Sequence, residues 1–139
     1  MARKSLQDVG CDYDHGTGHG IGSFLSVHEG PQRIAKKPVV QSAELLPGMI
    51  ISNEPGYYKE NSFGIRIENL IIVKEKTSNL IEFETISWAP IDRDLIEKKL
   101  LNDFEVQWIN WYHSTVYKKI QNFLSIKEKK WLQKVTKTL

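Results

Sequence analysis

Apolar residues fall in short runs over the first two thirds of the chain and recur with a helical period in the last third. Runs rich in β-branched and aromatic residues, bounded by turn signals such as Pro55-Gly56 and Asn61-Ser62, predict strands. These strands are expected at residues 24–28, 49–52, 64–68, 70–74, 83–87 and 88–91. Because short turns connect the central runs, the pattern predicts an antiparallel sheet.

Residues 2–9 favour a helix that Gly10 ends. This helix has no Ser, Thr, Asp or Asn before it to satisfy its first amides, so it resembles the tail of a longer element. We therefore expect the chain to be a C-terminal fragment of a longer protein.

The last third predicts two amphipathic helices. Asn102 with Glu105 forms a capping-box pattern that opens a helix of about 22 residues, and Ser125 with Glu128 opens a second one at Ile126. Large apolar residues follow the first cap at steps of three and four: Phe104, Trp108, Trp111, Tyr112, Val116, Ile120, Phe123 and Leu124. We expect the first three of these to pack against the sheet or a second subunit, because so much aromatic area is unfavourable in water.

Composition and charge narrow the class of protein. The 139 residues are 40% hydrophobic and 26% charged, which is typical of a globular domain. No apolar run reaches the roughly 20 residues of a membrane span, the N-terminus has no signal-peptide pattern, and a lone Cys11 excludes a disulfide scaffold, so a cytoplasmic location is expected. Residues 101–139 carry seven basic and three acidic side chains, but without arginine this pattern indicates a solvated helix face rather than nucleic-acid binding.

Candidate chemistry is concentrated in a glycine-rich stretch. Three of the four histidines, His15, His19 and His28, lie within 14 residues among glycines that let backbone and ligands approach closely. The spacing of the first two matches the zinc-protease helix His-Glu-x-x-His, but Gly16 and Gly18 break that helix and the glutamate is missing. A nucleotide-binding loop is also a poor match, because neither the third glycine nor a Gly-Lys-Ser/Thr is present.

Two glutamates lie beside turns or inside apolar strands. Glu54 precedes Pro-Gly, and Glu68 ends a predicted strand. Burying such a carboxylate is unfavourable unless it is paired or bound to a metal, and the alternative for Glu68 is a salt bridge with Arg66 on the same strand face. Two carboxylates and the imidazole of His19 suit Mn, Co, Zn or Fe(II), so we expect these three side chains to converge on one point.

Five short motifs follow one another along the chain. They are His15-Gly-Thr-Gly-His-Gly-Ile-Gly22, Val27-His-Glu-Gly-Pro31, Leu46-Pro-Gly-Met49, Asn53-Glu-Pro-Gly-Tyr57 and Gly64-Ile-Arg-Ile-Glu-Asn69. Together they resemble the C-terminal catalytic region of the Xaa-Pro aminopeptidase (aminopeptidase P) family, which belongs to the M24 metallopeptidase superfamily. The resemblance runs from about residue 2 to the C-terminus and includes the Trp- and Tyr-rich helix. It implies an α/β fold, the C-terminal portion of the pita-bread fold, with an antiparallel sheet followed by two helices.

This resemblance implies a function and a site. It makes His19, Glu54 and Glu68 ligands of two divalent metal ions, typically Mn(II), that activate a water for attack on the bond before proline. His15 and His28 match histidines that bind substrate and assist proton transfer. The implied substrates are peptides with proline in second position.

Arg66 completes the implied site as a catalytic-site residue that orients Glu68. The family also uses two aspartates from strands that lie several dozen residues before the glycine-rich stretch with the three histidines. In this sequence only 14 residues precede His15. We therefore expect residues 1–95 to be the C-terminal half of a catalytic domain and residues 96–139 a helical extension. A homodimer or an upstream half of the same enzyme is the expected partner, and the alternatives are a prolidase-like dipeptidase or a non-catalytic interaction module.

Overall fold

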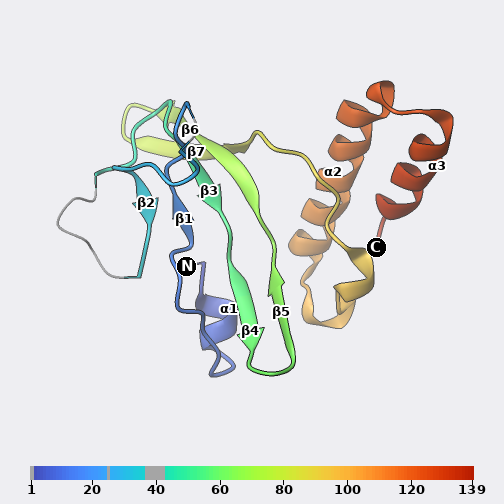
Figure 1. Cartoon of the computed structure of the whole chain (residues 1–139), viewed down its shortest axis with the longest axis horizontal. Coiled ribbons are helices and arrows are strands. Elements are labelled where there is room, and N and C mark those ends of the chain that lie inside the picture. Colours follow the sequence, from blue (N-terminus) through green and yellow to red (C-terminus); the bar gives the residue numbers. More distant parts are fainter. Residues whose placement is uncertain (1, 25, 37–42) are drawn as a thin grey trace. The chain divides into compact units, whose positions relative to one another are not determined.

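The structure, a computed structural model, describes residues 2–24, 26–36 and 43–139. It divides into two compact units, Met1–Ser87 and Trp88–Leu139. The first unit contains the strands and the second contains the long helices (Figure 1). The sequence suggests a boundary after residue 95 between the half of a catalytic domain and a helical extension, and that boundary stays a prediction.

The N-terminal unit opens with a single helical turn. Helix α1 covers Lys4–Gln7, which is shorter than the predicted 2–9, and Arg3 at its N-cap makes no side-chain capping bond. Gly10 has a φ of +74°, the left-handed conformation that follows many helix ends and that glycine adopts without strain. The predicted role of Gly10 just beyond the helix is therefore confirmed, whereas the helix itself is shorter than predicted at both ends.

Among the described residues, seven strands pair in three antiparallel arrays, which confirms the predicted antiparallel architecture. Strand β6 lies at the centre of the three-stranded sheet, and its residues Ile71 and Val73 are buried on one face together with Ile51 of the neighbouring strand. Figure 1 shows the long hairpin of β4 and β5. The arrays are β1 (Gly18–His19) with β2 (Arg33–Ile34), β3 (Ile50–Asn53) with β6 (Asn69–Thr77) and β7 (Leu80–Thr85), and β4 (Gly56–Lys59) with β5 (Phe63–Arg66).

The predicted strand over residues 24–28 is wrong. None of its described residues lies in a strand, and Leu25 lies outside the described residues. The Gly22 N–H donates to the Ser26 carbonyl at 2.8 Å, so neither of these two backbone groups is free to pair in a ladder. The chain instead returns as β2, whose Arg33 lies opposite His19 of β1.

The C-terminal unit consists of helices, as predicted. Both capping boxes are present, with Asn102 and Glu105 opening α2 (Asp103–Ile120) and Ser125 and Glu128 opening α3 (Ile126–Val135). Helix α2 has 18 residues rather than about 22, because its last predicted turn is a 3₁₀ turn, η3 (Gln121–Phe123). Two more 3₁₀ turns precede α2, η1 (Arg93–Leu95) and η2 (Lys98–Leu100). Within the described residues, no helix combines the length and apolarity needed to cross a membrane.

The predicted strand over residues 88–91 is also wrong. The Ala89 carbonyl accepts from the Tyr112 hydroxyl at 2.9 Å, and the Ile91 N–H donates to His113 Nε2 at 3.1 Å. Side chains of α2 thus take the backbone groups that a strand would use. Residues 88–91 are therefore an extended connection along α2 and not part of the sheet.

Phe104, Trp108 and Trp111 are not buried within the C-terminal unit. Their side chains are 83%, 46% and 54% exposed. The buried face of α2 lies one step around the helix, at Ile109, Tyr112, His113 and Val116, and it packs with Leu132 of α3. Packing of the three aromatic residues against the sheet or a second subunit stays a prediction.

His113 gives the C-terminal unit a predictable pH dependence. It is fully buried, and burial together with the nearby Arg93 guanidinium lowers the pKa of His113 below 6.5. A folded-state pKa below the unfolded value means that the unfolded chain binds the proton more tightly. The contribution of the neutral His113 side chain to the free energy of unfolding is therefore fully present above the unfolded-state pKa of about 6.5. It is lost as the pH falls toward the lower pKa of the folded state.

We expect the free energy of unfolding of this unit to decrease between pH 7.5 and about pH 5. Tryptophan fluorescence during urea unfolding measures it selectively, because all four tryptophans lie in residues 88–139. In the His113→Gln variant this part of the pH dependence should disappear. An equal slope in both proteins would assign the effect to other groups.

Candidate functional site

Two glycines allow His19 to lie between neighbouring strands. A Cβ on Gly18 would collide with the carbonyl of Ser52, and a Cβ on Gly20 would collide with the carbonyl of Glu29. Only glycine fits such a close backbone approach. Strand β1 is thereby held against β2 on one side and against β3 on the other, where Gly20 bridges to the strand.

His19 and Glu54 meet, as the sequence predicts for two of the three proposed metal ligands. His19 Nε2 lies 2.9 Å from Glu54 Oε1, and Glu54 is only 7% exposed. Ser52, which is fully buried, joins the pair: its hydroxyl accepts from the His19 backbone N–H at 3.0 Å and donates to Glu54 Oε1 at 2.9 Å. Ser52 of β3 thus fixes His19 of β1 and Glu54, which directly follows β3, relative to each other.

Arg66 holds the other carboxylate oxygen. Its Nη1 donates to Glu54 Oε2 at 3.0 Å, and its Nε donates to the Tyr58 hydroxyl at 2.8 Å. The hydrogen bond to Tyr58 is the largest cause that raises the pKa of Arg66 above its ordinary value, so the guanidinium is cationic. The expectation that Arg66 orients Glu68 differs from the structure, in which Arg66 pairs with Glu54.

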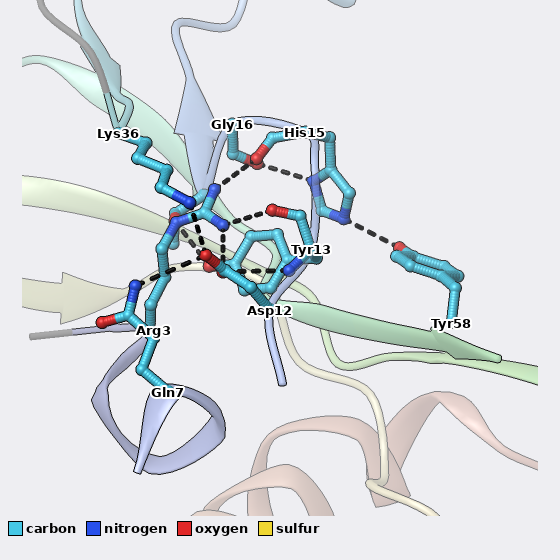
Figure 2. Close-up of polar contacts among 9 residues, drawn as sticks. Arg3, Gln7, Asp12, Tyr13, His15, Gly16, Lys36 and Tyr58 are labelled. Carbon is cyan, nitrogen blue, oxygen red and sulfur yellow. Dashed lines mark hydrogen bonds and ion pairs between the residues drawn. The ribbon is translucent and has the colours of Figure 1, made fainter. Parts of the chain in front are cut away.

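His15 lies at the far end of the same network. Its Nδ1–H donates to the Gly16 carbonyl at 2.7 Å, which leaves Nε2 as the acceptor for the Tyr58 hydroxyl at 2.9 Å. Figure 2 shows the His15 ring pointing toward Tyr58. A chain of hydrogen bonds therefore runs from Glu54 through Arg66 and Tyr58 to His15.

His28 lies beside His19, and the three histidines share one cavity. The ring centroids of His28 and His19 are 4.2 Å apart. The cavity has a volume of about 490 Å³ and is lined by all three histidines, by Glu54 and by Arg66. Five of the six predicted site residues are thus brought together.

Glu68 is the exception. It lies between β5 and β6, is exposed, and does not line this cavity. Among the described residues its carboxylate makes no ion pair or hydrogen bond, so the alternative of a Glu68–Arg66 salt bridge is not observed. No group of three His, Cys, Asp or Glu side chains able to hold a metal is present in the described part of the chain.

The pair of His19 and Glu54 nevertheless fits a divalent cation. His19 Nδ1–H donates to the Gly20 carbonyl at 3.0 Å, so Nε2 is the ring nitrogen that faces the Glu54 carboxylate. Either a proton between Nε2 and Oε1 or a cation bound to both atoms satisfies this contact. Protein ligands lie about 2.0–2.2 Å from such ions, so two ligands at a right angle are about 3 Å apart, close to the observed 2.9 Å.

Sequence reasoning missed Tyr58 and Ser52. Tyr58 lies opposite Gly64 in the β4–β5 hairpin, and Ser52 precedes Glu54 by two residues on one strand edge. Alternation along β4 places the two neighbouring tyrosines, Tyr57 and Tyr58, on opposite faces. That alternation was the available signal for one tyrosine facing the site, although the pattern does not say which.

Comparisons with known sequences agree with these features. A family model described as metallopeptidase family M24 matches residues 1–75, and one described as the C-terminal region of peptidase M24 matches residues 79–139. A probable Xaa-Pro aminopeptidase P of Tuber melanosporum is 47% identical over 145 aligned positions, covering 98% of this chain. The chain spans only 23% of that relative's length.

Comparisons with solved structures support the same family and the pita-bread fold. The crystal structure of X-prolyl aminopeptidase from Caenorhabditis elegans, described as a cytosolic enzyme with a di-nuclear active site, superposes with a TM-score of 0.87 at 35% identity. The match covers 99% of this chain and 23% of that one. An Xaa-Pro dipeptidase from Bacillus anthracis matches 65% of this chain and 23% of its own, with a TM-score of 0.53 at 35% identity. On this evidence, the chain belongs to metallopeptidase family M24.

Proposed function

We propose that this chain supplies the C-terminal part of the catalytic domain of an Xaa-Pro aminopeptidase, which removes the N-terminal residue from peptides with proline in second position. The observation that carries the proposal is the contact of His19 with Glu54 inside a cavity shared by three histidines. The relative of known structure that matches 99% of the chain is an X-prolyl aminopeptidase described as cytosolic, and we infer the same compartment here.

His19, Glu54 and Glu68 are the residues that would hold two divalent metal ions, for which Mn(II) is our first candidate and Co, Zn and Fe(II) are the others. Such ions supply an acidified water as nucleophile when they are bound. Within this chain, Ser52 and Arg66 fix both oxygens of Glu54, and Gly20 fixes the tautomer of His19 through its carbonyl. Both donors are therefore oriented before a ligand arrives.

The remaining residues handle the substrate. His28 faces the cavity beside His19 and stabilises negative charge on the carbonyl oxygen or moves a proton at its ring nitrogens. His15 Nε2 accepts from the Tyr58 hydroxyl, and it binds a substrate carbonyl by donating when this nitrogen carries a proton. Arg66 keeps Tyr58 polarised as a donor.

A dipeptidase is the nearest alternative within the family. The match to the Bacillus anthracis dipeptidase covers 65% of this chain, whereas the match to the aminopeptidase covers 99%. Residues 79–139 also match the C-terminal region of the peptidase family. The fuller coverage favours the aminopeptidase, and substrate length distinguishes the two activities.

The experiment is a chimera in which the region of the Tuber melanosporum relative that precedes the matched segment is fused to residues 1–139. We expect this chimera to cleave Xaa-Pro-Xaa tripeptides with added Mn(II) and to prefer them over Xaa-Pro dipeptides. The chain alone should be at least about a thousandfold slower, equivalent to about 4 kcal/mol, because its described residues gather only two metal donors.

The chimera carrying His19→Ala is the matched negative control, and a chelator should stop hydrolysis by the unmodified chimera. Preference for dipeptides would assign the region to a dipeptidase instead. A chimera that folds but cleaves neither substrate would contradict the proposal and favour a non-catalytic interaction module. Rapid hydrolysis by the chain alone would show that two aligned donors suffice.

A further inference from the structure

Arg3 occupies an unusual position for a residue at a helix start. It is only 8% exposed, and its guanidinium lies over the Tyr13 ring at 3.7 Å. Nη1 donates to Asp12 Oδ1 at 2.6 Å and also to the Tyr13 carbonyl, while Nη2 donates to the His15 carbonyl at 2.5 Å. Figure 2 shows the guanidinium between the Asp12 carboxylate and the carbonyls of Tyr13 and His15.

Asp12 anchors this guanidinium from the opposite side. Its carboxylate also accepts from Lys36 at 2.6 Å, from the Tyr13 backbone N–H at 2.9 Å and from Gln7 at 3.4 Å. The hydrogen bonds from Lys36 and then from Arg3 hold the pKa of Asp12 well below its usual range. The carboxylate is therefore charged throughout the physiological range, and Arg3 always has a counter-charge.

The loop that Arg3 holds leads directly to the His15 ring. The Tyr13 ring lies 4.7 Å from the His15 ring, and the Tyr13 hydroxyl is hydrogen-bonded to Thr17 at 2.6 Å. One donor group thus fixes two carbonyls, two residues apart, on the same segment. Without it, both carbonyls lose a charge-assisted hydrogen bond, and the backbone that directs His15 toward Tyr58 is no longer fixed.

We propose that Arg3 is a positioning residue of the active site: it fixes the backbone of residues 13–15 so that His15 Nε2 reaches the Tyr58 hydroxyl. The contribution of this placement to hydrolysis rests on the proposed function, whereas the placement itself does not. Arginine is required because its planar guanidinium offers several donors in a fixed fork. A lysine at this position keeps the charge beside Asp12 but cannot reach the acid and both carbonyls in the same way.

The test is ¹⁵N NMR of the histidine side chains in the 139-residue chain, at a pH of about 8 where imidazoles are neutral. Wild-type His15 should show two well-separated ring-nitrogen signals, because one tautomer is fixed by Gly16 and Tyr58. In Arg3→Gln we expect this separation to fall by about half or more as both tautomers become populated. Arg3→Lys should give a partial loss, and Lys4→Gln, which removes an exposed ion pair from the same helix, should give none.

His113 serves as the internal control for folding. It is buried in the other compact unit, and its Nε2 accepts from the Ile91 N–H, so its signals should be unchanged in every variant. Circular dichroism of the strands checks the N-terminal unit itself. The proposal is overturned if His15 keeps its separation in Arg3→Gln, if Arg3→Lys behaves as wild type, or if the His15 change comes only with loss of the strand signal.

These outcomes are independent of peptide hydrolysis. A chimera that fails to cleave Xaa-Pro peptides while His15 responds to Arg3 would reject the proposed function and leave the positioning role. If the chimera hydrolyses these peptides but the His15 signals are the same with Arg3 and with Arg3→Gln, the positioning role is rejected and the proposed function stands. In an active chimera, Arg3→Gln should lower kcat/KM by about tenfold to a hundredfold, and Arg3→Lys should restore part of it.

Discussion

Glu54→Ala is expected to destabilise the N-terminal unit by about 2 kcal/mol and to lower kcat/KM of the chimera by at least about a hundredfold. The stability loss follows from the contacts of this carboxylate. Its removal leaves the fully buried Ser52 hydroxyl without its acceptor and Arg66 without its counter-charge. Because the Arg66 side chain is 42% exposed, water replaces part of that second contact, which keeps the loss below that of a fully buried pair.

The loss of activity follows from a different property of the same residue. Glu54 is the carboxylate that meets His19 in the cavity, so its removal leaves a single donor from this pair. Metal chemistry that depends on positioned ligands is then lost, and each 1.36 kcal/mol of transition-state stabilisation is worth about tenfold in rate.

Amide hydrogen exchange of β3 measures the stability change, because the strand carries Ser52 and lies next to the altered residue. Glu60→Ala is the matched control, since Glu60 is exposed in the β4–β5 turn and is not part of the network. It should change neither exchange nor hydrolysis. Unchanged exchange in Glu54→Ala would mean that the buried contacts contribute little to the fold.

Local signals in the sequence were sufficient for much of this architecture. Two capping boxes and the glycine after α1 marked helix ends correctly, because those residues satisfy backbone groups close to them in the chain. The glycines around His19 likewise indicated a close backbone approach. The caps depend on neighbours within a few residues, which a sequence displays directly, whereas the glycines indicated a close approach without identifying its partners, Ser52 and Glu29.

Other features depend on partners distant in the chain. Residues 88–91 have a strand-like composition, but their backbone groups bond to Tyr112 and His113 of α2. The helical period marked an apolar stripe on α2, yet it could not say which part of that broad stripe faces α3.

The residues of the site were predictable from the sequence, but their contacts were not. Residue types and a family resemblance identified His15, His19, His28, Glu54 and Arg66, which the fold gathers around one cavity. Neither revealed that Arg66 pairs with Glu54 rather than with its strand neighbour Glu68. That choice is made by the β4–β5 hairpin, which places Arg66 opposite Gly56 and so beside the Glu54-Pro55 segment.

Glu68→Ala is expected to separate stability from activity, in contrast to Glu54→Ala. Glu68 is exposed and makes no ion pair or hydrogen bond among the described residues, so its removal should change the unfolding free energy of the chain by no more than about 0.5 kcal/mol. In the chimera, the proposed ligand role predicts a loss of at least about a hundredfold in kcat/KM.

The matched control for this variant is Glu75→Ala on β6, which removes an exposed carboxylate from the next strand. Manganese bound per mole of chimera, measured after gel filtration, should fall in Glu68→Ala and stay unchanged in the control. If Glu68→Ala keeps both its metal and its activity, the carboxylate is a surface group and the site is built without it. If metal is retained but activity is lost, Glu68 acts on the substrate or on a proton, and the ligand set must be completed by residues outside this chain, because within its described part only His19 and Glu54 meet.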